Sequence, residues 1–137
     1  MQNPYSSSVM AHSKLNFKIS TKEKMHVIKL EEPKLAENMA ASLTELVMPY
    51  LEAPVKNLIL DFSETKSIDS AFVEEMARIQ RTFYEQNASM VFCCFSGEVI
   101  HFLKEKDFLD ELNYTPTESE AWDIVQMDEI ERELLKG

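Results

Sequence analysis

The chain has 137 residues, a length that suits one domain built around one hydrophobic core. Apolar residues make up 45% of it and charged residues 28%, which is the composition of a globular chain and not of a disordered one. Its 24 acidic and 14 basic side chains give a net charge of -10, which repels phosphate backbones and anionic membranes, so we expect neither nucleic acid nor membrane insertion.

Several kinds of functional site are disfavoured by residue type and spacing. The two glycines, Gly97 and Gly137, cannot form the glycine-rich loops with which nucleotide enzymes hold phosphates. The three histidines lack the spacing typical of zinc sites, so no metal and no cofactor are expected. No nucleophile-base pair follows from spacing, which argues against an enzyme. The longest apolar run, residues 90–95, is too short to cross a membrane, and no signal peptide opens the chain, so we expect a cytoplasmic protein.

The first thirty residues divide into a tail and two strands. Residues 1–13 are rich in serine and show no periodicity, so we predict a disordered tail before a single domain over 14–137. Apolar and polar residues alternate over 15–19, and 25–30 is rich in β-forming residues. The polar segment between them predicts a hairpin.

The middle of the chain predicts two helices and a buried strand. After Pro33, apolar side chains recur at helical spacing from 35 to 51, and this indicates one long amphipathic helix that ends before Pro54. The run 57–62 is nearly all apolar, as in a central strand that is covered on both faces. A polar loop follows, and the apolar stripe over 72–83 predicts a second helix, with Asp69 or Ser70 as its N-cap.

The last third predicts another buried strand and two more helices. The strand covers 88–95, and a short helix covers 98–103. Residues 117–120 match a capping box, so a final helix starts there, with a short edge strand near Tyr114 before it. The apolar residues assigned to that final helix are Ala121, Trp122, Val125, Ile130 and Leu134. The element order ββαβαβα(β)α predicts an α/β fold with a mixed sheet of four to five strands and helices packed on it.

Cys93 and Cys94 are neighbours within the predicted strand 88–95. Adjacent side chains on a strand point to opposite faces, so we expect two reduced thiols that pack as small hydrophobic groups on different sides of the sheet. A redox pair is the alternative. It is disfavoured because adjacent buried cysteines usually serve in packing.

Five segments together resemble the STAS domain, which is shared by anti-sigma factor antagonists and sulphate-transporter tails. They are Leu58-Ile59-Leu60-Asp61-Phe62-Ser63, Ile68-Asp69-Ser70, Met90 to Phe95, Ser96-Gly97-Glu98-Val99, and Pro116-Thr117-Glu118-Ser119-Glu120-Ala121. The resemblance extends from about Leu15 to Trp122, and it implies the STAS fold. In bacterial antagonists of this family, the serine after the aspartate is phosphorylated by a partner kinase that is itself the anti-sigma factor. The resemblance assigns that role to Ser70.

The match at this serine is incomplete. The family stretch reads Asp-Ser-Ser-Gly, and this chain has Asp69-Ser70-Ala71-Phe72. A glycine lets another backbone approach closely, so Phe72 either adds bulk to the docking face or is a core side chain at the start of the helix. Both interpretations stay open at this stage.

Two functions are therefore expected from the resemblance. The first is a non-enzymatic module that binds an anti-sigma factor with serine kinase activity while Ser70 is unphosphorylated, and so regulates transcription. The second is a constitutive structural subunit of a signalling complex or transporter assembly, in which Ser70 acts only as a helix cap. The residues expected to contact the partner are Asp61, Ser63, Glu64, Asp69, Ala71, Phe72, Glu74 and Glu75.

Overall fold

The structure is a computed structural model that describes residues 14–136, so the tail predicted at 1–13 lies outside the described residues. Strands and helices alternate after an opening hairpin, as the sequence predicts. The elements are β1 Phe17–Thr21, β2 His26–Leu30, β3 Lys34–Leu35, η3 Glu37–Met39, α1 Ala40–Val47, η4 Met48–Glu52, β4 Leu58–Asp61, β5 Ser67–Ile68, α2 Ser70–Glu85, β6 Met90–Cys93, α3 Gly97–Glu105, η5 Leu109–Glu111, β7 Tyr114–Thr115 and α4 Glu118–Leu135.

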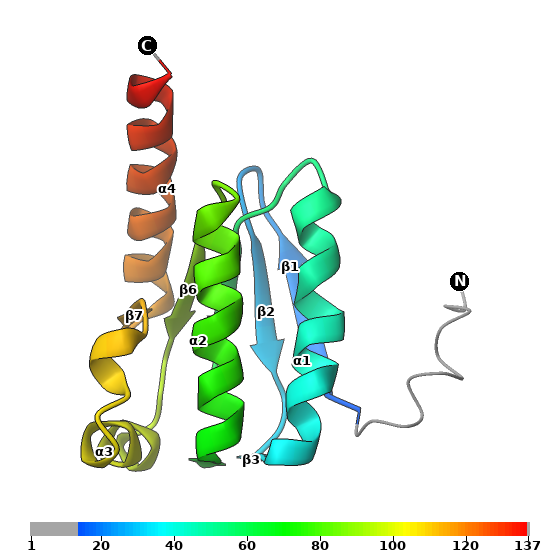
Figure 1. The fold of residues 1–137 in the computed structure, drawn as a ribbon, viewed down its shortest axis with the longest axis vertical. Helices are drawn as coiled ribbons and strands as arrows, with labels where there is room; N and C mark the ends of the chain where they lie inside the picture. The colour runs from blue at the N-terminus through cyan, green and yellow to red at the C-terminus, as the bar shows by residue number, and fades with distance from the viewer. Residues whose placement is uncertain (1–13, 137) are drawn as a thin grey trace.

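A five-stranded mixed sheet with the order β1-β2-β4-β6-β7 forms the centre of the molecule. The β1–β2 hairpin is antiparallel, and the remaining neighbours in this sheet pair in parallel. Helices α1 and α2 lie side by side against the sheet, and α4 runs along its other face (Figure 1). None of the helices within residues 14–136 combines the length and the apolar composition needed to cross a membrane.

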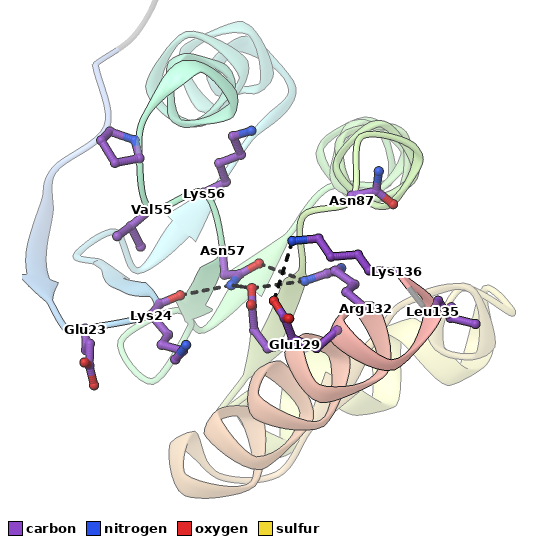
Figure 2. A pocket seen from close by; sticks show the side chains of 12 residues that line it. Glu23, Lys24, Val55, Lys56, Asn57, Asn87, Glu129, Arg132, Leu135 and Lys136 are labelled. Carbon is purple, nitrogen blue, oxygen red and sulfur yellow. Dashed lines mark hydrogen bonds and ion pairs between the residues drawn. The ribbon is translucent and has the colours of Figure 1, made fainter.

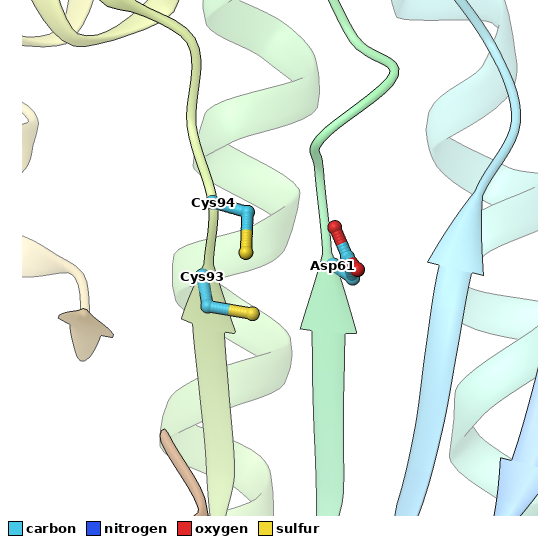
Figure 3. A group of neighbouring side chains, drawn as sticks. All are labelled: Asp61, Cys93 and Cys94. Carbon is cyan, nitrogen blue, oxygen red and sulfur yellow. The ribbon is translucent and has the colours of Figure 1, made fainter. Parts of the chain in front are cut away.

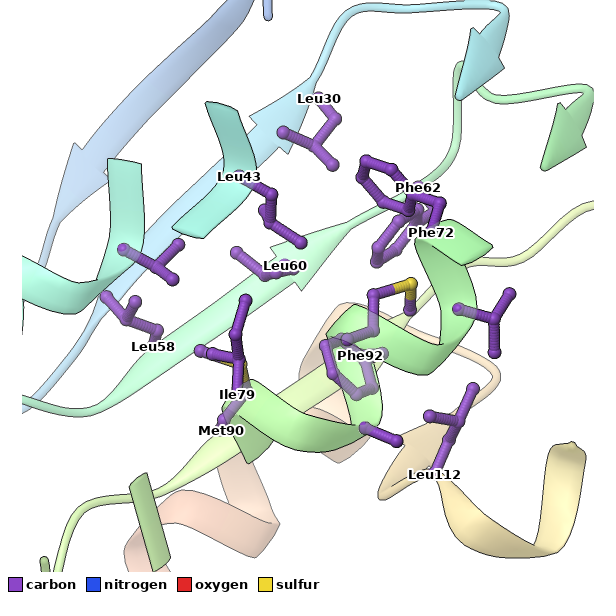
Figure 4. Packing of buried hydrophobic residues seen from close by; sticks show 14 of the residues in the cluster. Leu30, Leu43, Leu58, Leu60, Phe62, Phe72, Ile79, Met90, Phe92 and Leu112 are labelled. Atoms are coloured by element: carbon purple, nitrogen blue, oxygen red, sulfur yellow. The ribbon is translucent and has the colours of Figure 1, made fainter. Parts of the chain in front are cut away.

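Alternation along β4 divides its side chains between two cores. Ile59 is in register with Val27 and Val91, and these three pack with Ala121 and Val125 of α4. Leu58 and Leu60 point to the opposite face, where they join the larger cluster under α1 and α2 (Figure 4). All four residues of β4 and all four of β6 are buried, which confirms the prediction of central strands covered on both faces.

The single long helix predicted over 35–51 is wrong. Leu35 lies in β3, which pairs in parallel with β5 as a small second sheet, Leu35 opposite Ile68. Helix α1 ends at Val47, and the chain continues through Pro49 as a 3-10 turn. Proline has no backbone N–H and its ring collides with the preceding helical turn, so an α-helix cannot continue through that position.

The final helix also differs from its prediction in how much of it is covered. Ala121 and Val125 are buried, but Ile130 is 59% exposed and Leu134 is 74% exposed. The reason is geometric, because the last turns of α4 extend past the end of the sheet (Figure 1). Thr117 is the N-cap residue of this helix, and its hydroxyl accepts the backbone N–H of Glu120 at 3.3 Å, which is the N-cap half of the predicted capping box. The Glu120 carboxylate accepts a hydrogen bond from the Thr117 hydroxyl at 2.7 Å.

We predict that Ile59→Ala lowers the free energy of unfolding by about 2–5 kcal/mol, because it removes a fully buried side chain and leaves a cavity between β4 and α4. Urea denaturation of both variants measures this. The matched control Ile130→Ala, at an exposed site on α4, should cost less than about 1 kcal/mol. A cost below about 1 kcal/mol for Ile59→Ala would contradict its place at the centre of the sheet.

Candidate functional site at the start of helix α2

The loop between β4 and α2 is held by backbone hydrogen bonds to the segment around β3. The backbone N–H groups of Lys66 and Ser67 donate to the Pro33 carbonyl oxygen at 2.7 and 3.1 Å. The N–H of Asp69 donates to the carbonyl oxygen of Leu35 at 2.9 Å. The small β3–β5 sheet thus fixes where α2 begins, although the sequence predicted only a polar loop at β5.

Asp69 is the N-cap residue of α2, and Ser70 is the first residue of the helix. The Asp69 carboxylate does not cap its own helix. Its Oδ2 accepts the backbone N–H of Glu37 at 3.0 Å, which ties the start of α2 to the segment before α1. Ser70 is half-buried, at the positive end of the helix dipole.

Phe72 resolves the two interpretations of its position. Its side chain is fully buried and packs in the cluster that contains Leu60 and Phe62 (Figure 4). Phe72 is therefore a core residue at the start of α2, and its side chain is not available for contact with a partner. Ala71 beside it is half-buried, and Glu74, two residues after Phe72, is exposed.

The acidic side chains expected around Ser70 are not all free surface charges. Arg78 donates to both carboxylate oxygens of Glu75, and the hydroxyl of Thr44 in α1 donates to the same group. The hydrogen bonds from Arg78 lower the pKa of Glu75, with help from Thr44, against an opposing effect of burial. Glu64 is exposed and lies 3.8 Å from Lys29 across the ends of β4 and β2.

Asp61, expected among the partner-contacting residues, is almost fully buried. It is 6% exposed, and its Oδ1 accepts the backbone N–H of Ser63 at 2.8 Å. Its carboxylate points toward the sulfur atoms of Cys93 and Cys94 (Figure 3). The expectation that these two thiols occupy opposite faces is wrong, because β6 ends at Cys93 and Cys94 has a left-handed backbone with φ 68°.

At the opposite end of the sheet, next to the amino ends of the central strands, lies a hollow of about 620 Å³ that the sequence did not predict. At its base, Asn57 donates to Glu129 at 2.7 Å (Figure 2). Arg132 donates to the hydroxyl of Ser89 at 2.9 Å. Asn57 Oδ1 also accepts the N–H of Ser89 at 2.8 Å. These polar groups satisfy one another and fasten the second half of α4 to β4 and β6, so we assign the network a structural role.

The STAS domain model matches residues 16–121, and these residues include the strands, α1 and α2, and the start of α4. The chain belongs to the STAS family. No match was found among curated proteins.

Solved structures share this fold at low sequence identity. A Thermotoga maritima protein described as a candidate anti-sigma factor antagonist is 20% identical over 80% of this chain and 94% of its own, with a TM-score of 0.67. Unphosphorylated SpoIIAA, an anti-sigma factor antagonist, is 18% identical over 81% of this chain and 98% of its own, with a TM-score of 0.59. Phosphorylated SpoIIAA from Bacillus also matches.

The same STAS fold occurs in a membrane transporter. The murine anion transporter Slc26a9 is 11% identical over 88% of this chain, with a TM-score of 0.62, and the match covers 24% of the transporter chain. The fold alone therefore does not decide between a signalling module and a structural subunit.

We predict that Glu75→Gln lowers the free energy of unfolding by about 0.5–1 kcal/mol near neutral pH, because it removes a partly exposed ion pair with Arg78. The pKa of Glu75 is lower in the folded chain than in the unfolded one. The stabilisation is thus complete above the ordinary value of 4.5 and is lost as the pH falls through the lower folded value.

Urea denaturation of wild type and Glu75→Gln at a series of pH values tests this prediction. The stability difference should be constant near neutral pH and should shrink at pH values below 4.5. Glu74→Gln is the matched control, since Glu74 is the exposed neighbour on the same helix. A Glu75→Gln difference that grows on acidification would contradict the assigned sign.

Proposed function

We propose that this STAS protein is a non-enzymatic, cytoplasmic binding module that holds an anti-sigma factor with serine kinase activity while Ser70 is unmodified, and releases it after Ser70 is phosphorylated. The observation that carries the proposal is the position of Ser70, which is the half-buried first residue of α2, directly after Asp69. That is the position of the acceptor serine in the family motif. SpoIIAA, which shares the fold, is described in both unphosphorylated and phosphorylated forms.

The local structure can accept a phosphate without a change of fold. The first backbone N–H groups of a helix have no partners within the helix, and the helix dipole favours negative charge there. The Asp69 carboxylate is committed to the N–H of Glu37 and does not cap α2. A phosphoryl group of about -1.5 to -2 charge on Ser70 therefore has favourable electrostatics within its own chain.

The same charge opposes binding at the surface of the partner. Glu64, in the loop after β4, and Glu74, in the first turns of α2, are both exposed. A phosphate on Ser70 therefore adds negative charge to a surface that already carries acidic side chains. It also has to be desolvated when a partner covers Ser70. A loss of about 1.4 kcal/mol already weakens binding tenfold, so one phosphate suffices for a switch.

The contact surface follows from what is exposed around Ser70. We assign it to five side chains that lie at least partly on the surface, namely Ser63, Glu64, Asp69, Ala71 and Glu74, with Glu75 at its border. Phe72 supports this surface from the core and Asp61 from below the loop. An anti-sigma factor that binds here would contact small and acidic side chains of this chain. Charge complementarity then favours a basic surface on the anti-sigma factor.

A constitutive structural subunit is the second candidate. The Slc26a9 match shows that the STAS fold also occurs as a minor part of an anion transporter. Ala71 and Phe72 replace the second serine and the glycine of the family motif, and this departure is the sequence feature that favours the second candidate.

We predict that Ser70→Ala keeps the fold at a cost below about 0.5 kcal/mol, since Asp69 and not Ser70 is the N-cap residue. This variant should bind the partner permanently. Ser70→Asp should also fold, because a carboxylate is favourable in the first turn, but it should bind at least about tenfold more weakly because of its charge.

Affinity capture from the native cell with each variant as bait, followed by incubation of the captured partner with ATP, measures both effects. Intact mass should show one phosphate on wild type and none on Ser70→Ala. Ser67→Ala is the matched control, because Ser67 is an exposed serine in β5, three residues before Ser70, and its loss should leave phosphorylation unchanged. Equal affinity of wild type and Ser70→Asp would refute the switch and support the structural subunit.

A further inference from the structure

Three potential metal ligands meet where the two central strands end. Asp61 is the last residue of β4 and Cys93 the last of β6, and the two are direct neighbours in the parallel register. Cys94 follows at once. One carboxylate oxygen and the two sulfur atoms all lie within 4.8 Å of one another, and they point into the same space between the strand ends (Figure 3).

The backbone at Cys94 creates this arrangement. Its φ of 68° is in the left-handed region, which residues other than glycine seldom adopt, and it turns the second thiol toward the first instead of to the opposite face. The backbone N–H of Cys94 donates to the Thr115 carbonyl oxygen at 3.3 Å, and the N–H of Phe62 donates to the Cys93 carbonyl oxygen at 3.0 Å. Both strand ends are thus held at the base of the cluster.

The surroundings of the two thiols favour a cation. Cys93 is fully buried and Asp61 nearly so, while Cys94 is half-buried and gives access from solvent. Deprotonated, the three groups would place three anionic ligand atoms close together in a largely buried space, and a bound cation would neutralise that charge.

We propose that Asp61, Cys93 and Cys94 form a zinc site, which is a property separate from the phosphorylation of Ser70. On binding Zn²⁺, the two thiols release their protons to solvent, two Zn–S bonds form, and one carboxylate oxygen of Asp61 becomes the third ligand. The fourth position of the tetrahedron is left for water or an external ligand.

The distances suit this ion. Zn–S bonds of about 2.3 Å in a tetrahedron place two sulfur atoms about 3.8 Å apart. The three ligand atoms lie within 4.8 Å of one another, which is close to that spacing. Thiolate ligands select zinc over magnesium and calcium, which take oxygen ligands.

Oxidation of the pair is the weaker alternative. Cys93 is fully buried, which limits its access to an oxidant. Adjacent residues across a trans peptide also have Cα atoms about 3.8 Å apart, closer than the roughly 4.4–6.8 Å that disulfides usually need. No cis peptide bond occurs within residues 14–136.

The test uses the full-length, reduced chain with Co²⁺ as a spectroscopic probe and Zn²⁺ as a competitor. Cys93 and Cys94 are the only cysteines of the sequence, so any thiolate-to-cobalt charge-transfer band reports this cluster alone. We expect the band to saturate at one Co²⁺ per chain and to disappear on addition of Zn²⁺. Zinc should also raise the midpoint of thermal unfolding, because it binds the folded arrangement of three ligands more tightly than the unfolded chain.

Two variants and one control locate the site. Cys94→Ser and Asp61→Asn should each weaken zinc binding by at least about tenfold, since even loss of a group that only supports a ligand costs about 10–100-fold. His101→Ala should change nothing, although His101 and Glu105 lie 3.5 Å apart on the surface of α3 and offer a rival weak site.

The proposal is overturned if wild type shows no thiolate-to-cobalt band, or if Cys94→Ser binds zinc as tightly as wild type does. The wild-type spectrum decides the matter even if a variant fails to fold. The same titration on Ser70→Ala should match wild type, so failure of the zinc site and failure of the phosphorylation switch are separate results.

Discussion

Burial of β4 on both faces is the constraint on which the rest of this structure depends. Ile59 needs α4 to cover it, and Leu58 and Leu60 need α1 and α2 on the other side. Helices that connect parallel strands cover both faces of the central strand. The same connections bring the carboxyl ends of neighbouring strands to one end of the sheet. Asp61 and the cysteine pair lie at that end of the sheet, and the loop after β4 leads from it to Ser70.

The two candidate sites differ in what holds them. The position of Ser70 depends on a short non-local pairing. The two-residue strands β3 and β5, and the hydrogen bond that the Glu37 N–H donates to the Asp69 carboxylate, fix the start of α2 against the segment before α1. The cysteine cluster depends on the main sheet itself, since Asp61 and Cys93 are register partners in β4 and β6. A change that loosens the first site therefore need not disturb the second.

Local patterns were sufficient for most of the fold but for only part of the sites. The apolar runs predicted β4 and β6, and Thr117 with Glu120 predicted the start of α4, because these signals lie within a few residues of one another. The pairing of Leu35 with Ile68 joins residues far apart in the chain, so the helical spacing after Pro33 was misleading. Residue type could not place Phe72 in the core, and no pattern of apolar residues reports the positive φ of Cys94.

A rigid start of α2 also limits how a modification at Ser70 can act. Asp69, Lys66 and Ser67 are already bonded to the segment around β3, and Phe72 is packed beneath them, so a phosphate has little freedom to rearrange the loop. In the proposed switch its effect would be electrostatic and local to the surface around Ser70. On a chain with a net charge of -10, one more anion changes the protein as a whole very little, whereas at a desolvated contact it changes affinity severalfold or more.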